Sequence, residues 1–147
     1  MCVWVRRFLV SGEQNDHTKN SRIRDLVNNQ LARKTAAIFG FFGVLFGAFG
    51  AHILRGLLEQ SGSVQIWQTA VLYHLVHAVV LLVLSGWRPI PRLAYYLILI
   101  GVMVFSGSLY ALALTNFKWF GAITPLGGIG MLSGWLALAL ARGDGKE

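Results

Sequence analysis

The stretch "WQTAVLYHLVHAVVLLVLS", residues 67–85, has the length and apolar content of a helix that crosses a bilayer. It nevertheless carries two histidines, His74 and His77, three positions apart inside the apolar run. Backbone groups in lipid must be hydrogen-bonded within their own segment, so an α-helix is predicted here. On that helix both histidines share one stripe with Trp67 and Leu81, which predicts that they face other parts of the protein.

The rest of the chain continues the membrane pattern. Of its 147 residues, 55% are hydrophobic and 13% are charged, whereas soluble domains carry roughly twice that charged share. Three further spans are predicted, at residues 35 to 54 (to Leu58 if the Arg55 side chain reaches out of the apolar layer), 93–114 and 119–141. Short connections make consecutive helices antiparallel neighbours. The predicted fold is therefore all-α, an integral membrane bundle of four transmembrane helices with up-down topology.

Composition divides the chain into three parts. Residues 1–34 form a polar, basic tail, residues 35–141 a four-span membrane domain, and residues 142–147 a short C-terminal tail. Within the first tail, apolar residues at helical spacing are consistent with a basic amphipathic helix on an anionic membrane surface, and a solvated tail is the alternative. These apolar residues are Ile23, Leu26, Val27 and Leu31.

Lysine and arginine near the spans predict the orientation. Nine lie on the side of the two termini, whereas the other side has Arg55 and Lys118. Because basic residues stay preferentially in the cytoplasm, both termini are predicted to be cytoplasmic, and alkaline phosphatase fused after Glu147 should be inactive in a bacterial host. The nine are Lys19, Arg22, Arg24, Arg33, Lys34, Arg88, Arg92, Arg142 and Lys146.

The composition argues against several classes of function. The single cysteine, Cys2, excludes an intrachain disulfide, and the +7 net charge lacks the aromatic interleaving of a nucleic-acid surface. His74 and His77 are adjacent on one helix and cannot occupy opposite axial positions of one haem, while no acidic residue or cysteine lies in the spans to complete a metal site. We therefore predict no metal and no cofactor, with both histidines hydrogen-bonded between helices.

Glycines predict where helices pack. Gly40, Gly43, Gly47 and Gly50 form one stripe on the first span, and small residues are how helices approach closely in lipid. Gly130 and Gly134 form a shorter stripe on the last span. This second stripe is predicted to meet the first or to mediate a homo-oligomer.

With both termini cytoplasmic, polar, glycine and proline residues gather in the outer half of the bundle and predict a pocket there. Two interpretations of the last span stay open: a helix that begins at Pro125 with Thr124 as its N-cap, or a helix that begins near Trp119 and is kinked at Pro125. The candidate pocket residues are His52, Trp67, Thr69, Tyr73, His74, His77, Ser106, Ser108, Tyr110, Thr124 and Pro125.

Four ordered motifs, "GAFGAH", "WQTAVLYHLVHA", "FSGSLYALAL" and "TPLGGIGMLSGW", resemble a known family. The chain is similar, over residues 35–141, to the small integral membrane proteins of domain of unknown function 423. The resemblance implies a four-span protein of the cell membrane and no established activity. It also implies a chain that starts shortly before the first span, which makes Val27 an alternative start and leaves residues 1–26 as an extension. The matching positions are Gly47, Gly50, Ala51, His52, Trp67, Thr69, Ala70, Tyr73, His77, Ser106, Gly107, Ser108, Tyr110, Thr124, Pro125, Gly127 and Gly128.

Three functions are compatible with these features. The favoured hypothesis is a non-enzymatic accessory or interaction protein whose partners are the lipid bilayer and other membrane components. The first alternative is a binder or carrier of a small or lipid-like molecule in the outer-half pocket. The second is a haem- or metal-dependent redox protein that uses the membrane histidines.

Overall fold

The computed structural model describes the backbone of residues 2–141 and the side chains of residues 26–141. Over that range the secondary structure is helical and contains no strand, which confirms the predicted all-α class. The helices are α1 (Cys2–Ala51), α2 (Arg55–Gln60), α3 (Val64–Leu84), α4 (Arg92–Thr115) and α5 (Trp119–Leu140).

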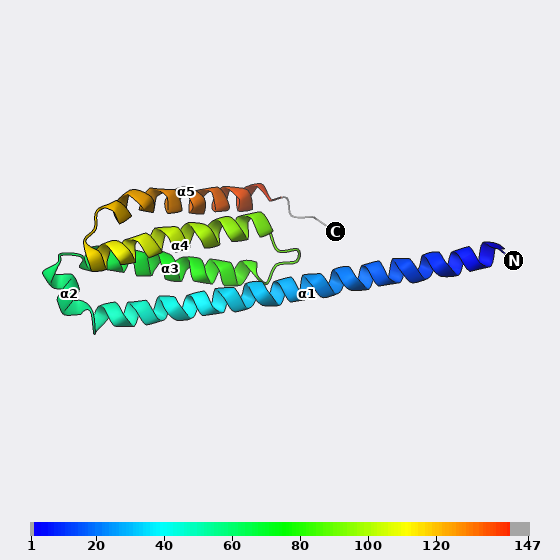
Figure 1. Ribbon diagram of the computed structural model, residues 1–147, viewed down its shortest axis with the longest axis horizontal. Helices are drawn as coiled ribbons and strands as arrows, with labels where there is room; N and C mark the ends of the chain where they lie inside the picture. Colours follow the sequence, from blue (N-terminus) through cyan, green and yellow to red (C-terminus); the bar gives the residue numbers. More distant parts are fainter. Residues whose placement is uncertain (1, 142–147) are drawn as a thin grey trace.

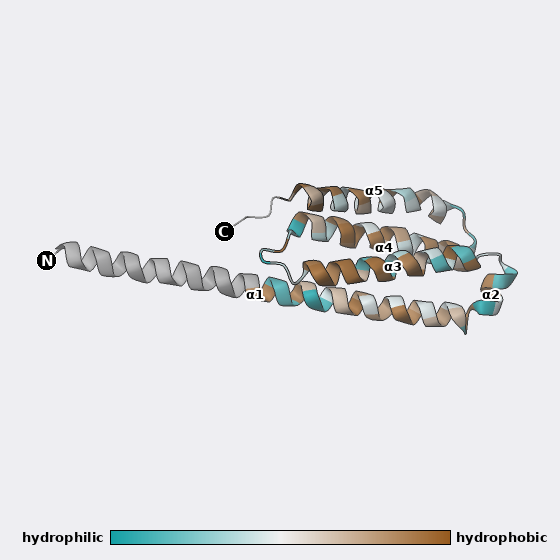
Figure 2. Cartoon of the chain, turned by 180° about the vertical axis from the view of Figure 1, so that it is seen from behind, coloured by the Kyte–Doolittle hydropathy of each residue, from teal (hydrophilic) through white to brown (hydrophobic). Residues whose placement is uncertain are grey.

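Four of these helices are long and apolar enough to cross a membrane: α1 from Leu26 onwards, α3, α4 and α5. They alternate in direction, each packs on the next, and α1 and α5 form the two flanks (Figure 1). The predicted up-down bundle is thus confirmed. Hydrophilic residues gather at α2 and in the connection between α3 and α4 (Figure 2), and we call these the α2 end and the loop end of the bundle.

The first span differs from its predicted limits at both ends. Residues 26–34 continue α1 without a break, so the boundary drawn at residue 35 lies inside a helix. At the other end the proposed extension to Leu58 is wrong, because α1 stops at Ala51 and residues 52–54 form a turn. The tail predictions that depend on side chains before residue 26, or on residues 142–147, lie outside the described residues.

The turn leads into α2, a short exposed helix. Arg55 Nε lies 2.9 Å from Glu59 Oε1 one turn later, and this hydrogen bond and the carboxylate charge raise the pKa of the guanidinium. Gly62 then reverses the chain at φ 67°, and the Ser63 amide donates to the Leu58 carbonyl at 2.9 Å. A positive φ suits glycine because it has no Cβ.

Two clusters of buried side chains hold the helices together. The cluster at the α2 end contains Leu58, Trp67, Ala70, Tyr110 and Ala113. The cluster at the loop end contains Ala36, Leu81, Leu84, Tyr95 and Ile98. The cluster at the loop end joins α1, α3 and α4, whereas the cluster at the α2 end joins α2, α3 and α4, with Phe46 of α1 packed against it.

Of the two predicted starting points for the last span, Trp119 and Pro125, the structure agrees with Trp119. Helix α5 starts at Trp119 and contains Pro125, so Thr124 is not an N-cap. Proline has no amide hydrogen, which removes the hydrogen bond that the Gly121 carbonyl would otherwise accept. The Thr124 hydroxyl lies 3.1 Å from the Phe120 carbonyl oxygen of the preceding turn.

Candidate functional site

The stripe predicted on residues 67–85 is buried in the bundle. His74 and His77 keep 4% and 6% of their surface exposed, and Ala70 and Leu81 keep none. The predicted burial of both histidines is confirmed. The two rings nevertheless contact different helices, His74 meeting α1 and α4 and His77 meeting α5.

His74 lies between α1 and α4. Its Nε2 is 3.0 Å from the Phe39 carbonyl oxygen, and its Nδ1 is 3.3 Å from the Tyr110 hydroxyl. A carbonyl can only accept, so Nε2 carries the hydrogen and Nδ1 accepts from the tyrosine. The ring also packs on Phe39, with centroids 4.0 Å apart. These contacts define a neutral imidazole with the hydrogen on Nε2.

His77 faces α5. Its Nδ1 is 2.9 Å from the Tyr73 carbonyl oxygen in the preceding turn, and its Nε2 is 3.3 Å from the indole nitrogen of Trp135. An indole N–H can only donate, so Nε2 accepts and Nδ1 carries the hydrogen. His77 is therefore the opposite neutral tautomer from His74. In this arrangement neither ring offers a lone pair to a metal ion.

Three side chains from α3 and α4 donate to backbone carbonyls of α1. Tyr95 donates to Ala32 at 2.8 Å, His74 to Phe39 at 3.0 Å and Trp67 to Phe46 at 3.0 Å. The accepting residues Ala32, Phe39 and Phe46 are seven positions apart, which is two turns and hence nearly the same helix face.

Small residues make these carbonyls accessible. A helix carbonyl points toward the side chain four residues later, and those positions are Ala36, Gly43 and Gly50. A Cβ on Gly50 would overlap the indole nitrogen of Trp67, and one on Gly43 would lie 3.3 Å from Cδ2 of His74. The glycine stripe of α1 thus opens its backbone to side-chain donors from α3.

Hydroxyl groups connect α4 with α5. The Ser108 and Thr124 hydroxyls are 2.8 Å apart, so one of them donates to the other. Each also lies within hydrogen-bonding distance of a carbonyl of its own helix, Phe105 for Ser108 and Phe120 for Thr124, and the hydroxyl that accepts keeps its single hydrogen for that carbonyl. Ser106 is buried, and its Oγ has no hydrogen-bond partner within the described part of the chain. The two serines therefore have different roles: Ser108 contacts α5 through Thr124, and Ser106 is a small packing residue.

The structure does not bring all the candidate residues to one pocket. His52 lies in the turn after α1 and is exposed, because α1 ends one residue earlier. Pro125 is exposed, and Thr69 donates to the Gln65 carbonyl of its own helix. The cavity found near the α2 end, about 340 Å³ between α1 and α3, shares Trp67 with the candidate set.

The two glycine stripes do not meet each other. Gly43, Gly47 and Gly50 of α1 face side chains of α3, and Gly130 and Gly134 of α5 face α4. The prediction that the second stripe packs on the first is therefore wrong. The reason is the order of helices in the bundle, which places α1 and α5 on opposite flanks.

Sequence reasoning missed several residues that complete this arrangement. Trp135 is the donor to His77, and Phe39 and Phe46 supply the carbonyls for His74 and Trp67. The signal for the carbonyls was present, because both residues lie four positions before a glycine of the predicted stripe. Gly101 on α4, which approaches the α5 backbone, was also overlooked. Among residues 26–141, no three His, Cys, Asp or Glu side chains are grouped to hold a metal ion.

Comparison with known proteins places these features in a family. The profile of the family described as "Protein of unknown function (DUF423)" matches residues 46–128. UPF0382 membrane protein YwdK of Bacillus subtilis is 40% identical over 112 residues, covering 71% of this chain and 89% of the relative. UPF0382 inner membrane protein YgdD of Escherichia coli K12 is 39% identical over 107 residues, covering 68% and 79%.

A third relative extends the comparison. UPF0382 membrane protein SH2409 of Staphylococcus haemolyticus is 44% identical over 99 residues, covering 65% of this chain and 80% of the relative. No solved structure matches. The relatives are named membrane proteins, and the chain has four helices able to span a bilayer, so it is a multi-pass membrane protein. The chain belongs to the DUF423 family of membrane proteins, whose molecular function is unknown.

Proposed function

We propose that this protein is a non-enzymatic accessory protein of the membrane, which acts through its lipid-facing surface. The observation that carries the proposal is the engagement of both buried histidines, whose four ring nitrogens each lie within 3.3 Å of a partner. An imidazole in that state has no lone pair free to ligate a metal or to take a proton from a substrate.

The other polar groups of the spans support the same proposal. Tyr110 and Ser108 bond to neighbouring helices, and no Asp, Glu, Lys or Arg lies between positions 35 and 51, 64 and 84, or 93 and 115. General acid and base catalysis needs a group that can change its protonation beside the substrate. These side chains instead hold the helices together.

Site-specific photo-crosslinking tests the accessory role. A benzophenone amino acid replaces Phe41 on α1 or Leu132 on α5, both exposed on the flanks, and Val102 serves as a buried control. We expect a discrete protein adduct from at least one flank and none from Val102. An adduct at twice the chain mass would identify a second copy as the partner. Lipid adducts alone at both flanks would contradict the proposal.

A second candidate function, binding of a lipid-like molecule, is favoured by the cavity near the α2 end. Its volume is about 340 Å³, and its walls include Gly47, Val71, Leu72 and Leu75. Ligand cavities of this size class are lined mainly by apolar side chains. The glycines of α1 leave the space, and an acyl chain or another apolar molecule would fill it.

Filling the cavity tests this second candidate. Leu72→Trp places a bulky ring in its wall, whereas Val79→Trp changes a similarly exposed residue of the same helix outside it. Native mass spectrometry in mild detergent should show a retained molecule that Leu72→Trp removes and Val79→Trp keeps. Equal retention in both variants would exclude the cavity as the binding site.

A further inference from the structure

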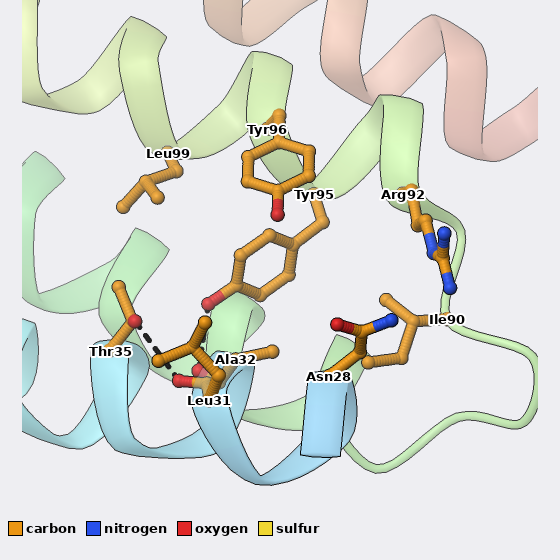
Figure 3. Close-up of a pocket in the computed structure, with 9 residues that line it drawn as sticks. All are labelled: Asn28, Leu31, Ala32, Thr35, Ile90, Arg92, Tyr95, Tyr96 and Leu99. Atoms are coloured by element: carbon orange, nitrogen blue, oxygen red, sulfur yellow. Dashed lines mark hydrogen bonds between the residues drawn. The ribbon is translucent and has the colours of Figure 1, made fainter. Parts of the chain in front are cut away.

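A second crevice lies at the loop end, between α1 and the start of α4 (Figure 3). Its volume is about 290 Å³. Side chains from α1, from the α3–α4 connection and from α4 line it. Among them are Leu31 of α1 and Arg92, Tyr95, Tyr96 and Leu99 of α4.

Tyr95 forms the inner wall of this crevice. Its hydroxyl donates to the Ala32 carbonyl at 2.8 Å, and the side chain is buried. The phenol thereby bridges α1 and α4. Tyr96, the next residue, is more than half exposed and its hydroxyl points toward the crevice (Figure 3). One tyrosine thus supports the crevice, while the other presents a hydroxyl group to it.

Polar and apolar groups occupy different depths. Arg92 is the first residue of α4, beside amide groups and a helix dipole that favour an anion. Leu99 lies seven residues further along α4, about 10 Å deeper in the bilayer direction. Leu31 faces the crevice from α1. The crevice is therefore polar where the span begins and apolar toward the membrane interior, which is the polarity profile of a lipid.

The charge of this end favours an anion. Arg33 and Lys34 of α1 and Arg88 of the α3–α4 connection are exposed at the loop end of the bundle. Within residues 26–141 the one acidic residue is Glu59, which pairs with Arg55 in α2 at the opposite end of the bundle. Basic groups next to a membrane span attract anionic lipids. An arginine also matches phosphate, because its guanidinium donates two parallel hydrogen bonds.

We propose that this crevice binds one anionic glycerophospholipid, with its phosphate at Arg92 and Tyr96 and the start of one acyl chain between Leu31 and Leu99. The volume accommodates a headgroup and the first part of a chain, and the rest of the lipid stays in the bilayer. The site lies at the opposite end of the bundle from the cavity between α1 and α3. It does not depend on the accessory function proposed above.

Native mass spectrometry of the full chain in mild detergent tests the site, with phosphatidylglycerol and phosphatidylethanolamine as probes. We expect one tightly retained phosphatidylglycerol, and about tenfold weaker binding in Arg92→Gln, which loses a charge-assisted hydrogen bond. Arg88→Gln is the matched control, because it removes the same charge four residues earlier in the chain, from a side chain that does not line the crevice. It should leave the affinity within about twofold.

A second pair of variants tests the apolar wall. Leu99→Trp fills the wall and keeps every charge, so it should also weaken phosphatidylglycerol binding about tenfold. Ile100→Trp, on the exposed face of α4, should not. Thermal unfolding of each variant verifies folding, and the arginine pair remains decisive if Leu99→Trp does not fold.

Three results would overturn the proposal. Equal losses in Arg92→Gln and Arg88→Gln would mean diffuse attraction by surface charge. Unchanged binding in a folded Leu99→Trp would remove the acyl-chain contact. Displacement of the lipid by millimolar inorganic phosphate would identify a soluble phosphate compound as the ligand instead.

Discussion

Glycines line both the contact between α4 and α5 and the contact between α1 and α3, but they meet different atoms. In the first, a Cβ on Gly101 would lie 2.5 Å from the Met131 amide nitrogen, and one on Gly127 would overlap the Phe105 backbone. In the second, glycines meet the side chains of Leu75, Val71 and Trp67. Two backbones touch in one interface, whereas side chains fill the space in the other.

This difference changes what each interface tolerates. Backbone atoms cannot move without moving a whole helix, whereas a side chain can change its rotamer. The α1 stripe also exposes carbonyls to donors from α3 and α4, so it supplies hydrogen bonds that the α4–α5 stripe does not. In lipid, where no hydrophobic force joins helices, close packing and interhelical hydrogen bonds are separate sources of stability. The following substitutions separate them.

Gly127→Ala should have the largest effect. The new methyl group would overlap Phe105 N and Cα, so α5 must move away from α4. We expect a loss of about 2–3 kcal/mol in the free energy of unfolding, measured by denaturation in detergent micelles.

Gly128→Ala is the matched control, because its Cβ would lie 3.9 Å from Phe105 Cδ2 at ordinary contact distance. Alanine favours a helix over glycine by about 1 kcal/mol, so this variant should be unchanged or slightly more stable. Equal destabilisation of the two variants would remove the backbone contact as the explanation.

Gly50→Ala should cost less, about 1–2 kcal/mol. Its methyl group would overlap the Trp67 indole, which can turn aside but then loses its bond to the Phe46 carbonyl. Gly40→Ala is the control on the same stripe, since its Cβ would lie 3.8 Å from the Ala78 Cβ. Thermal unfolding in detergent compares the two, and a larger loss from Gly40→Ala would contradict the carbonyl-access explanation.

His74→Gln should cost no more than about 0.6 kcal/mol, the average for one interhelical hydrogen bond in a membrane. Glutamine retains a donor for the Phe39 carbonyl and an acceptor for the Tyr110 hydroxyl. The same preparations should be examined by absorption spectroscopy. A Soret band in the parent that disappears in His74→Gln or His77→Gln would show that the histidines bind haem, and the structural role would be rejected.

Trp135→Phe should have the smallest effect, about 0.5 kcal/mol or less. The indole is 44% exposed, so its removal loses one donor to His77 and little packing. Nitrogen NMR of the imidazole should still show the hydrogen on Nδ1, because the bond to the Tyr73 carbonyl remains. A switch of the hydrogen to Nε2 would show that Trp135 determines the tautomer.

Much of the architecture was predictable from local sequence. Spans 67–85 and 93–114 agree closely with α3 and α4, and the short connections gave the antiparallel order. The physical reason is that lipid leaves the backbone no hydrogen-bond partner outside its own helix, so apolar length alone predicts a helix. The resemblance to the DUF423 family is likewise confirmed. The cytoplasmic position of the termini stays a prediction.

Other features depend on which helix faces which. Periodicity predicts that His74 and His77 share one buried stripe. It does not predict that His74 bonds to α1 and His77 to α5. It also found the glycines of both flanking helices without revealing that they never meet. A helical repeat defines a face, whereas the neighbour of that face depends on the order and rotation of all the helices.

The sequence by itself determined four membrane helices, their alternating direction and the buried stripe of α3, because each follows from apolar length, short connections and helical spacing. Only the tertiary structure decided the end of α1 at Ala51, the three carbonyl contacts on α1 and the crevice beside Arg92. These features join residues that are far apart in the chain, such as Ala32 and Tyr95. Packing between helices determines which residues form such pairs, and local sequence patterns carry no information about that packing.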